Sequence, residues 1–280
     1  MSLRTILSMA RLNQIVHQLP GCLNPRKSFI RKNFVSEQLY IYLTLIFILA
    51  GFVKGVTGMG LPTVAMGLLG MFMPLPIAAS LLVIPSFVTN VLQLFTGPSV
   101  MLIIRRLWLM MLLILAGTVA ASSLLISINT AWSAFGLGVV LIVYAVFALI
   151  SPSLTVSQAR EKWMSPVIGG ITGVITGATG VFVMPAVPFL QSLRFSKDEL
   201  VQALGLSFTV STVALAAGLY LHDALRVEQI SLSFMSILPA LAGMWLGQKV
   251  RACISAMRFR QCFLLFLIVL GIELISRPFI

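Results

Sequence analysis

The chain has 280 residues, of which 59% are hydrophobic and only 9% are charged, and its mean hydropathy is +1.06. A single soluble core cannot enclose that much apolar surface, so the composition predicts an all-α polytopic membrane protein embedded in the lipid bilayer. The net charge of +12 comes from basic residues in the N-terminal segment and the loops, where membrane orientation explains it. We therefore expect no nucleic-acid partner. The cysteines, Cys22, Cys253 and Cys262, have neither the number nor the spacing of a disulfide framework or a zinc site.

The first 38 residues form a segment of different character. They contain six basic residues against one acid, Glu37, and Pro20, Gly21 and Pro25 interrupt any helix. The apolar pieces are too short for a signal peptide. We therefore expect residues 1–38 to be a basic N-terminal tail, which is either a surface arm or a segment upstream of the real start, and which membrane insertion does not need.

The first half of the membrane core, 39–151, has few charges, so its loops must be found from prolines, glycines and length. We expect helices over 39–58, 61–73, 76–95, 107–127 and 131–150. The segment 61–73 is too short to cross, because thirteen residues at 1.5 Å each span roughly 20 Å against a hydrocarbon core of roughly 30 Å. It should dip to mid-depth and pack against its predecessor.

The second half repeats this order after a polar connecting loop over 152–164. We expect helices over 165–179, 180–192, 200–221, 230–249 and 259–276, followed by a short C-terminal end, 277–280. Each half, 39–151 and 165–276, would then contain a broken helix pair and three full helices, giving about eight full spans plus two half-helices. An odd number of crossings in the first unit inverts the second, so we predict two inverted repeats.

The loop charges of the core also suggest an orientation. If each broken pair returns to the side from which it entered, most of the basic loop residues fall on one face, which should be cytoplasmic: Arg105, Arg106, Arg160, Lys162, Arg194, Lys197, Lys249, Arg251, Arg258 and Arg260. The same assignment places the basic N-terminal tail outside, against the rule that basic segments stay on the cytoplasmic side. The side of the N-terminus therefore stays open.

A glycine-rich break lies at the start of each half. Gly51, Gly55 and Gly58 recur at an offset of 122 residues, with Thr57 repeated as Thr179. Glycine is a poor helix former, so we interpret six residues as helix-break positions: Gly51, Gly55, Pro62, Gly173, Gly177 and Pro185. The alternative is that the small-x3-small spacing of these glycines lets helices pack closely.

The breaks also suggest an anion site. A helix broken at mid-membrane leaves free N–H groups at the start of the next half-helix, here near Leu61 and Val181, with partial positive charge from the helix dipole. Lys54 would add a full charge, unless it snorkels to the surface or pairs with Glu273. With hydroxyls and backbone from both copies, the candidate substrate-binding residues at the breaks are Lys54, Thr57, Gly58, Gly60, Thr63, Thr176, Thr179 and Gly180.

Further polar residues lie on the helices that follow each broken pair. Asn90 and Gln93 follow the first break, and Ser207, Thr209 and Ser211 follow the second. All five can face a central cavity, and we include Asn90, Ser207 and Ser211 in the candidate site. The alternative is that they serve only as hydrogen-bonding glue between helices.

This arrangement resembles the sulfite exporter TauE/SafE family of membrane permeases. The resemblance covers roughly 40–276 and rests on the Gly-x3-Gly-x2-Gly break, the short Pro-containing half-helix, Ala78-Ala-Ser80 at the start of the next helix, and the repetition of the whole block. The family's usual Gly-Gly-Gly run is replaced by Gly58-Met-Gly60 and Gly180-Val-Phe. The resemblance implies a secondary transporter that moves a small anion, such as sulfite, an organosulfonate or a carboxylate, across the bacterial inner membrane.

Other functional classes have less support. The chain has no metalloprotease, serine-hydrolase or P-loop motif, so we expect neither an enzyme nor a cofactor or metal site. Without a nucleotide-binding domain, transport must draw on a gradient of the substrate or of a coupling ion, a proton or sodium. A permease for another small solute and a non-transporting scaffold are the alternatives, and the scaffold leaves Lys54 and the repeated break unexplained. Import and export, and the oligomeric state, stay open.

Overall fold

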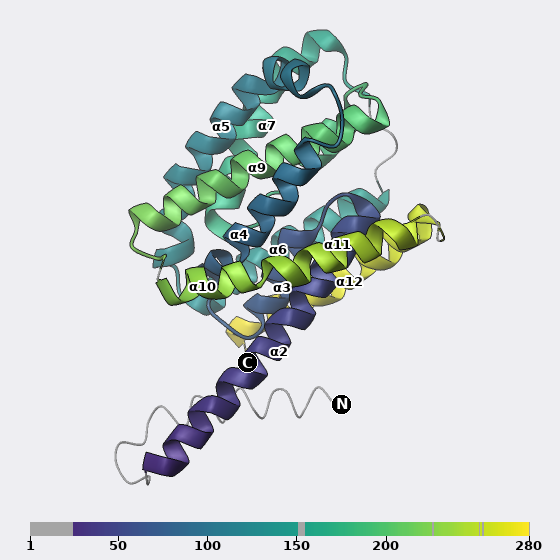
Figure 1. The fold of residues 1–280 in the computed structure, drawn as a ribbon. Helices are drawn as coiled ribbons and strands as arrows, with labels where there is room; N and C mark the ends of the chain where they lie inside the picture. Colours follow the sequence, from purple (N-terminus) through teal and green to yellow (C-terminus); the bar gives the residue numbers. More distant parts are fainter. Residues whose placement is uncertain (1–24, 151–154, 226, 252, 254, 280) are drawn as a thin grey trace. The chain divides into compact units, whose positions relative to one another are not determined.

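The computed structural model describes residues 25–279 except 151–154, 226, 252 and 254. Within these ranges every regular element is helical (Figure 1). The first half contains α2 (Pro25–Thr57), α3 (Leu61–Gly70), α4 (Leu75–Leu94), α5 (Val100–Ser127) and α6 (Thr130–Ile150). The second contains α7 (Gln158–Thr179), α8 (Ala186–Ser192), α9 (Lys197–Leu221), α10 (Val227–Met235), α11 (Ile237–Arg251), α12 (Ala256–Ser276) and the 3-10 turn η1 (Arg277–Phe279). The chain divides into two compact units, Met1–Leu43 and Thr44–Ile280, and the packing below is that of the second.

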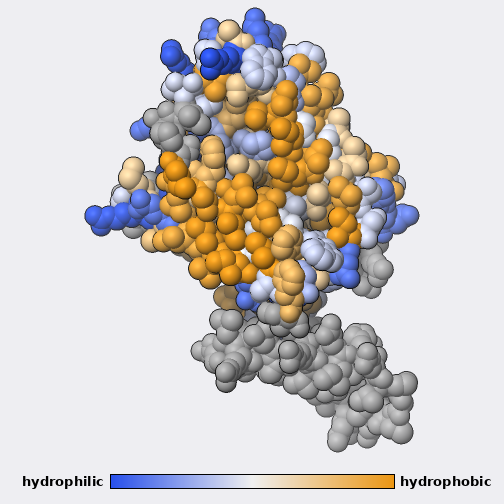
Figure 2. All heavy atoms as spheres, turned by 180° about the vertical axis from the view of Figure 1, so that it is seen from behind, coloured by the Kyte–Doolittle hydropathy of each residue, from blue (hydrophilic) through white to orange (hydrophobic). Residues whose placement is uncertain are grey.

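The expected class, an all-α polytopic membrane protein, is confirmed. Seven helical segments in the described part of the chain are long and apolar enough to cross a bilayer: Gln38–Thr57, Leu75–Leu94, Val100–Ser127, Thr130–Ile150, Lys197–Leu221, Gln229–Arg251 and Met257–Phe279. The remaining long helix, α7, has 22 residues but a charged first turn. Figure 2 shows a broad apolar surface across one face of the molecule, as expected for side chains in contact with lipid.

Several helices begin earlier than predicted. Arg105 and Arg106 lie inside α5, and Arg160 and Glu161 lie in the first turn of α7. The physical reason is an ion pair: Arg106 Nε and Nη2 donate to the two Glu161 carboxylate oxygens over 2.6 and 2.7 Å. A bidentate pair of this kind holds both helix ends together. The polar connecting loop is therefore shorter than the predicted 152–164.

Two other predicted boundaries also need correction. Helix α2 begins at Pro25, so part of the predicted tail is helical, while residues 1–24 lie outside the described residues. The single helix expected over 230–249 is two, α10 and α11, divided at Ser236. Pro239 follows this point and has no N–H to donate to the preceding turn, which is a sufficient cause for the break.

Helix α10 also completes the hydrogen bonding of α4. Pro85 lies inside α4 and leaves the Leu81 carbonyl without its helical N–H partner. The Ser233 hydroxyl of α10 donates to this carbonyl over 2.8 Å, and the Ile84 N–H donates to Ser233 Oγ over 3.3 Å. A polar side chain thus stabilises the helix at its proline.

The contacts between helices confirm that the repeats are inverted. Helix α4 and its repeat mate α9 run antiparallel: Gln202, near the start of α9, donates to the Gly97 carbonyl beyond the end of α4, while Asn90, earlier in α4, bonds Thr212, later in α9. The mates α6 and α12 also run antiparallel, because Arg260 contacts Ala148 and Gly271 packs on Gly138. Figure 1 shows α4 beside α9. Equivalent helices of opposite direction are what a two-fold inverted repeat requires.

Candidate functional site

The first break is built by two glycines in left-handed conformations. Helix α2 ends at Thr57, and Gly58 and Gly60 have φ angles of 77° and 107°. Residues with a Cβ rarely adopt such angles. Helix α3 starts immediately afterwards at Leu61, with Pro62 in its first turn, where a missing N–H does no harm. The predicted break at this position is confirmed.

The second break has a different geometry. Helix α7 ends at Gly180, whose φ angle is 72°, but α8 begins only at Ala186, with Pro185 as its N-cap after a cis peptide bond. The Val181 N–H donates to Thr179 Oγ1 over 3.3 Å. The prediction of free helical N–H groups near Val181 is therefore wrong. The local reason is that the Thr179 hydroxyl already satisfies this donor and a non-helical segment, 181–185, precedes α8.

The four earlier glycines are not helix breaks. Gly51 and Gly55 lie inside α2, and Gly173 and Gly177 lie inside α7. An added Cβ would overlap the backbone of a neighbouring helix, at Ala240 and Met244 of α11 for the first pair and at Ile114 and Thr118 of α5 for the second. The alternative interpretation, close helix packing through small residues, is the correct one.

Lys54 lies one turn before the first break and is buried, with 2% of its surface exposed. Its Nζ donates to Asn90 Oδ1 of α4, and Asn90 Nδ2 donates to Thr212 Oγ1 of α9 over 3.2 Å. The ammonium also lies 5.9 Å from the centroid of the Phe208 ring. Neither alternative for this residue, snorkelling or pairing with Glu273, describes its position.

The charge of Lys54 has no counter-charge within the described residues. Their one ion pair joins Arg106 to Glu161, and the one acceptor that Lys54 contacts is the neutral Asn90 amide. An ammonium has three N–H donors, and a buried cation without an anion is costly at membrane depth. The arrangement is therefore chemically suited to receive an anion.

The other candidates separate into two groups. The hydroxyls of Thr57, Thr176 and Thr179 donate to carbonyls of their own helices at 2.8, 2.7 and 2.7 Å, which is ordinary back-bonding. By contrast, the buried hydroxyls of three others have no hydrogen-bond partner: Thr63, Ser207 and Ser211. Such groups are uncommon in a well-packed interior and are open to a ligand.

Aromatic packing brings the two breaks together. Phe182, from the non-helical segment after the second break, packs on Phe208 with ring centroids 5.4 Å apart, and Phe208 also faces Lys54. From the other side, a Cβ at Gly180 would lie 2.6 Å from Met66 Cε of α3. Residues next to both breaks therefore contact Phe208.

Sequence reasoning missed Thr212 and Phe208. For Thr212 a signal existed, because it lies 122 residues after Asn90, which is the offset of the glycine repeat. Gln93, one turn further along α4, donates to the Gly58 carbonyl over 2.9 Å and to the Val201 carbonyl over 3.1 Å. It ties the first break to both α4 and α9.

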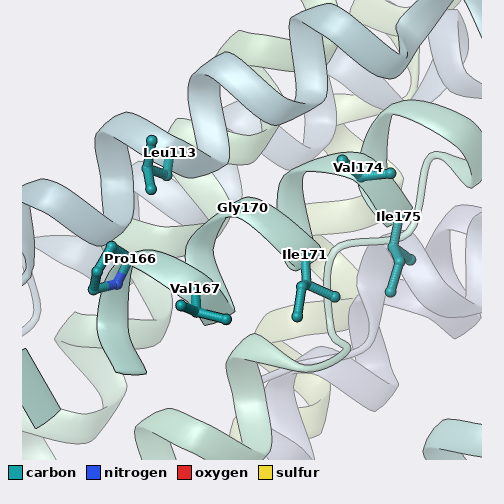
Figure 3. A pocket seen from close by; sticks show the side chains of 7 residues that line it. All are labelled: Leu113, Pro166, Val167, Gly170, Ile171, Val174 and Ile175. Atoms are coloured by element: carbon teal, nitrogen blue, oxygen red, sulfur yellow. The ribbon is translucent and has the colours of Figure 1, made fainter. Parts of the chain in front are cut away.

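The largest of the described cavities does not belong to this site. It has a volume of about 500 Å³ and lies between α5 and α7, lined by Leu113 and six residues of α7. Figure 3 shows that none of the lining side chains carries a polar group, and Gly170 leaves its floor open. Such a surface contacts lipid chains readily and offers nothing to orient a polar substrate.

Comparison with known proteins gives one match. The family model described as sulfite exporter TauE/SafE matches residues 43–274, which is most of the chain and includes both breaks. No curated protein and no solved structure matches. The match agrees with the membrane-spanning helices. The chain is a multi-pass membrane protein that belongs to the sulfite exporter TauE/SafE family.

Proposed function

We propose that this protein is a secondary transporter that moves a small oxyanion, sulfite or an organic sulfonate or carboxylate, across the cell membrane. The single observation that carries the proposal is the buried, uncompensated Lys54, bonded to Asn90 at the contact between α4 and α9. Membership of the permease family supports transport as the general activity.

The charge balance of the site favours an anion over a cation or a neutral solute. The Lys54 ammonium has the Asn90 amide oxygen as its acceptor, and much of the hydration that it loses on burial is not replaced. An incoming oxyanion accepts the remaining N–H donors and forms a neutral pair, in which charge-assisted hydrogen bonds are the strongest kind available. The unpartnered hydroxyls of Ser207, Ser211 and Thr63 can complete its coordination.

The location of the site also suits alternating access. The Asn90–Thr212 bond joins residues that are equivalent in the two repeats, so the site lies where the repeats meet. In transporters built from inverted repeats, movement of one repeat against the other opens a central site first to one side and then to the other. An anion held by Lys54 and the hydroxyls of α9 would contact both moving parts.

The test is flux of a panel of small anions, namely sulfite, sulfoacetate and taurine, in proteoliposomes with imposed proton and sodium gradients. We expect Lys54→Met to abolish sulfite flux and Lys54→Arg to retain part of it. The matched control is Lys162→Met, which removes an exposed lysine of α7 and should transport normally. Cation movement alone, or full sulfite flux in Lys54→Met, would refute the proposal.

A further inference from the structure

A polar cavity lies beside the first break. It has a volume of about 150 Å³ and is lined by Val56, Thr57, Met59, Tyr144, Gln191, Arg251, Arg260 and Phe263. Water occupies roughly 30 Å³ per molecule in the liquid, so the space is sufficient for a small oxyanion. These residues come from α2, α6, α8, α11 and α12 and the first break, which makes the cavity a product of the tertiary fold.

Two arginines from different helices contribute to this cavity. Arg251 is the last residue of α11 and Arg260 lies in the second turn of α12, and both side chains are exposed. No acidic residue is among those lining the cavity. Guanidinium groups bind oxyanions through paired N–H donors, and the Gln191 amide can supply another donor.

The cavity lies directly next to the proposed transport site. Thr57, in its wall, is three residues after Lys54, a rise of about 4.5 Å along the helix. Met59 in the same wall belongs to the break itself, and its sulfur lies 3.2 Å from the Tyr144 hydroxyl. An anion held here would lie beside the first break, within about one helical turn of Lys54 along α2.

The arginines have no equivalents in the other repeat. In α6, the equivalent of α12, no residue is charged, and the last turn of α5, the equivalent of α10 and α11, has no basic residue. Both arginines of this cavity thus come from the second repeat, although its wall is built from both halves of the chain.

Membrane orientation accounts for some basic residues at helix ends, and Arg260 also donates to the Ala148 carbonyl over 3.2 Å, near the end of α6. Neither role requires two guanidinium groups from α11 and α12 to line one cavity with Thr57. Lys249 shows the contrast, because its ammonium lies 3.8 Å from the Trp245 ring centroid and does not line the cavity.

We propose that this cavity is an anion-binding vestibule, in which Arg251 and Arg260 capture the oxyanion at one face of the membrane before it moves to Lys54. This inference rests on the proposed function and adds to it a second binding site, which is reached from one face of the membrane. The vestibule raises the local concentration of anion at the break through electrostatic attraction. It therefore acts on apparent affinity from one face, and not on the maximal rate.

The experiment compares sulfite flux of Arg251→Gln, Arg260→Gln and the double variant in inside-out and right-side-out vesicles. For the double variant we expect the KM for sulfite to rise about tenfold from one face only, with the maximal rate unchanged and a weaker dependence of KM on ionic strength. Arg260→Lys keeps the positive charge, and its KM for sulfite should be close to that of wild type. Lys249→Gln, on the same helix as Arg251, is the matched control for loss of one positive charge and should leave KM unchanged.

The outcomes separate this inference from the proposed function. If wild type transports sulfite and the double variant behaves like Lys249→Gln, the vestibule is refuted and the transport proposal stands. If wild type moves none of the tested anions, the transport proposal fails, and equilibrium binding of radiolabelled sulfite to the purified protein decides. Sulfite binding to wild type that is lost in the double variant supports the vestibule. No binding to wild type, or equal binding to wild type and the double variant, overturns it.

Discussion

The two breaks occupy equivalent positions in the repeats but are chemically different. The first has two left-handed glycines, a half-helix that begins at once, and the buried cation Lys54. The second has one left-handed glycine followed by Val181, Phe182 and Val183, all fully buried. The position equivalent to Lys54 is Thr176, whose hydroxyl bonds its own helix. The duplicated scaffold therefore has a buried cation at the first break and an uncharged threonine at the equivalent position of the second.

The largest effect is expected from exchanging this charge between the copies. In Lys54→Thr combined with Thr176→Lys, the net charge is conserved but the lysine leaves Asn90 and Phe208. We expect sulfite flux to fall at least about 100-fold, because loss of charge-assisted bonds in a desolvated site costs about 3 kcal/mol. Flux in proteoliposomes measures this.

Thermal unfolding of the same double variant in detergent provides its control, since a transport defect is informative only for a folded protein. Recovery of half the wild-type flux or more would mean that the breaks are interchangeable, and the contrast between them would be lost.

The second effect concerns a feature that both repeats share, the close packing of glycines against a neighbouring helix. Gly51 and Gly173 both pack on a neighbouring helix backbone, so Gly51→Val and Gly173→Val should each lower the free energy of unfolding, by about 3 kcal/mol. Gly170→Ala is the matched control in α7, because a Cβ there meets nothing within 4 Å. Thermal unfolding in detergent, followed by circular dichroism, should give Gly170→Ala a melting temperature at or above that of wild type. Equal melting temperatures for all three variants would contradict the packing role.

These results show which features are readable from sequence. Glycine spacing predicted the repeat and the end of α2 at Gly58, because left-handed backbone requires glycine locally. It could not distinguish that break from the packing role of Gly51, since a neighbouring helix backbone decides the matter. The partner of Lys54 and the cavity between Arg251 and Arg260 depend on long-range contacts between helices, which no local pattern specifies.

A third, smaller effect concerns the conformation of the first break. A Cβ at Gly58 would meet nothing within 4 Å, so substitution there is limited by its φ angle of 77° and not by crowding. Gly58→Ala should cost about 1–2 kcal/mol of unfolding free energy, and Gly58→Asn should cost less, because asparagine tolerates the left-handed region. Paired melts of the two variants check this order. The reverse order would indicate that the site is crowded by a neighbour.

The smallest effect is expected at Thr212, which gives the second repeat its hydrogen bond to the site. Thr212→Val is nearly isosteric and removes the acceptor of Asn90 Nδ2, while Asn90 Oδ1 still accepts from Lys54. Loss of one neutral hydrogen bond is worth about 1 kcal/mol, so sulfite flux should fall about fivefold. Thr209→Val removes a hydroxyl of the same helix that donates to the Gly205 carbonyl over 2.7 Å, and this control should transport normally. If both valine variants had the same flux, Asn90 would hold Lys54 without help from the second repeat, and the site would belong to the first copy alone.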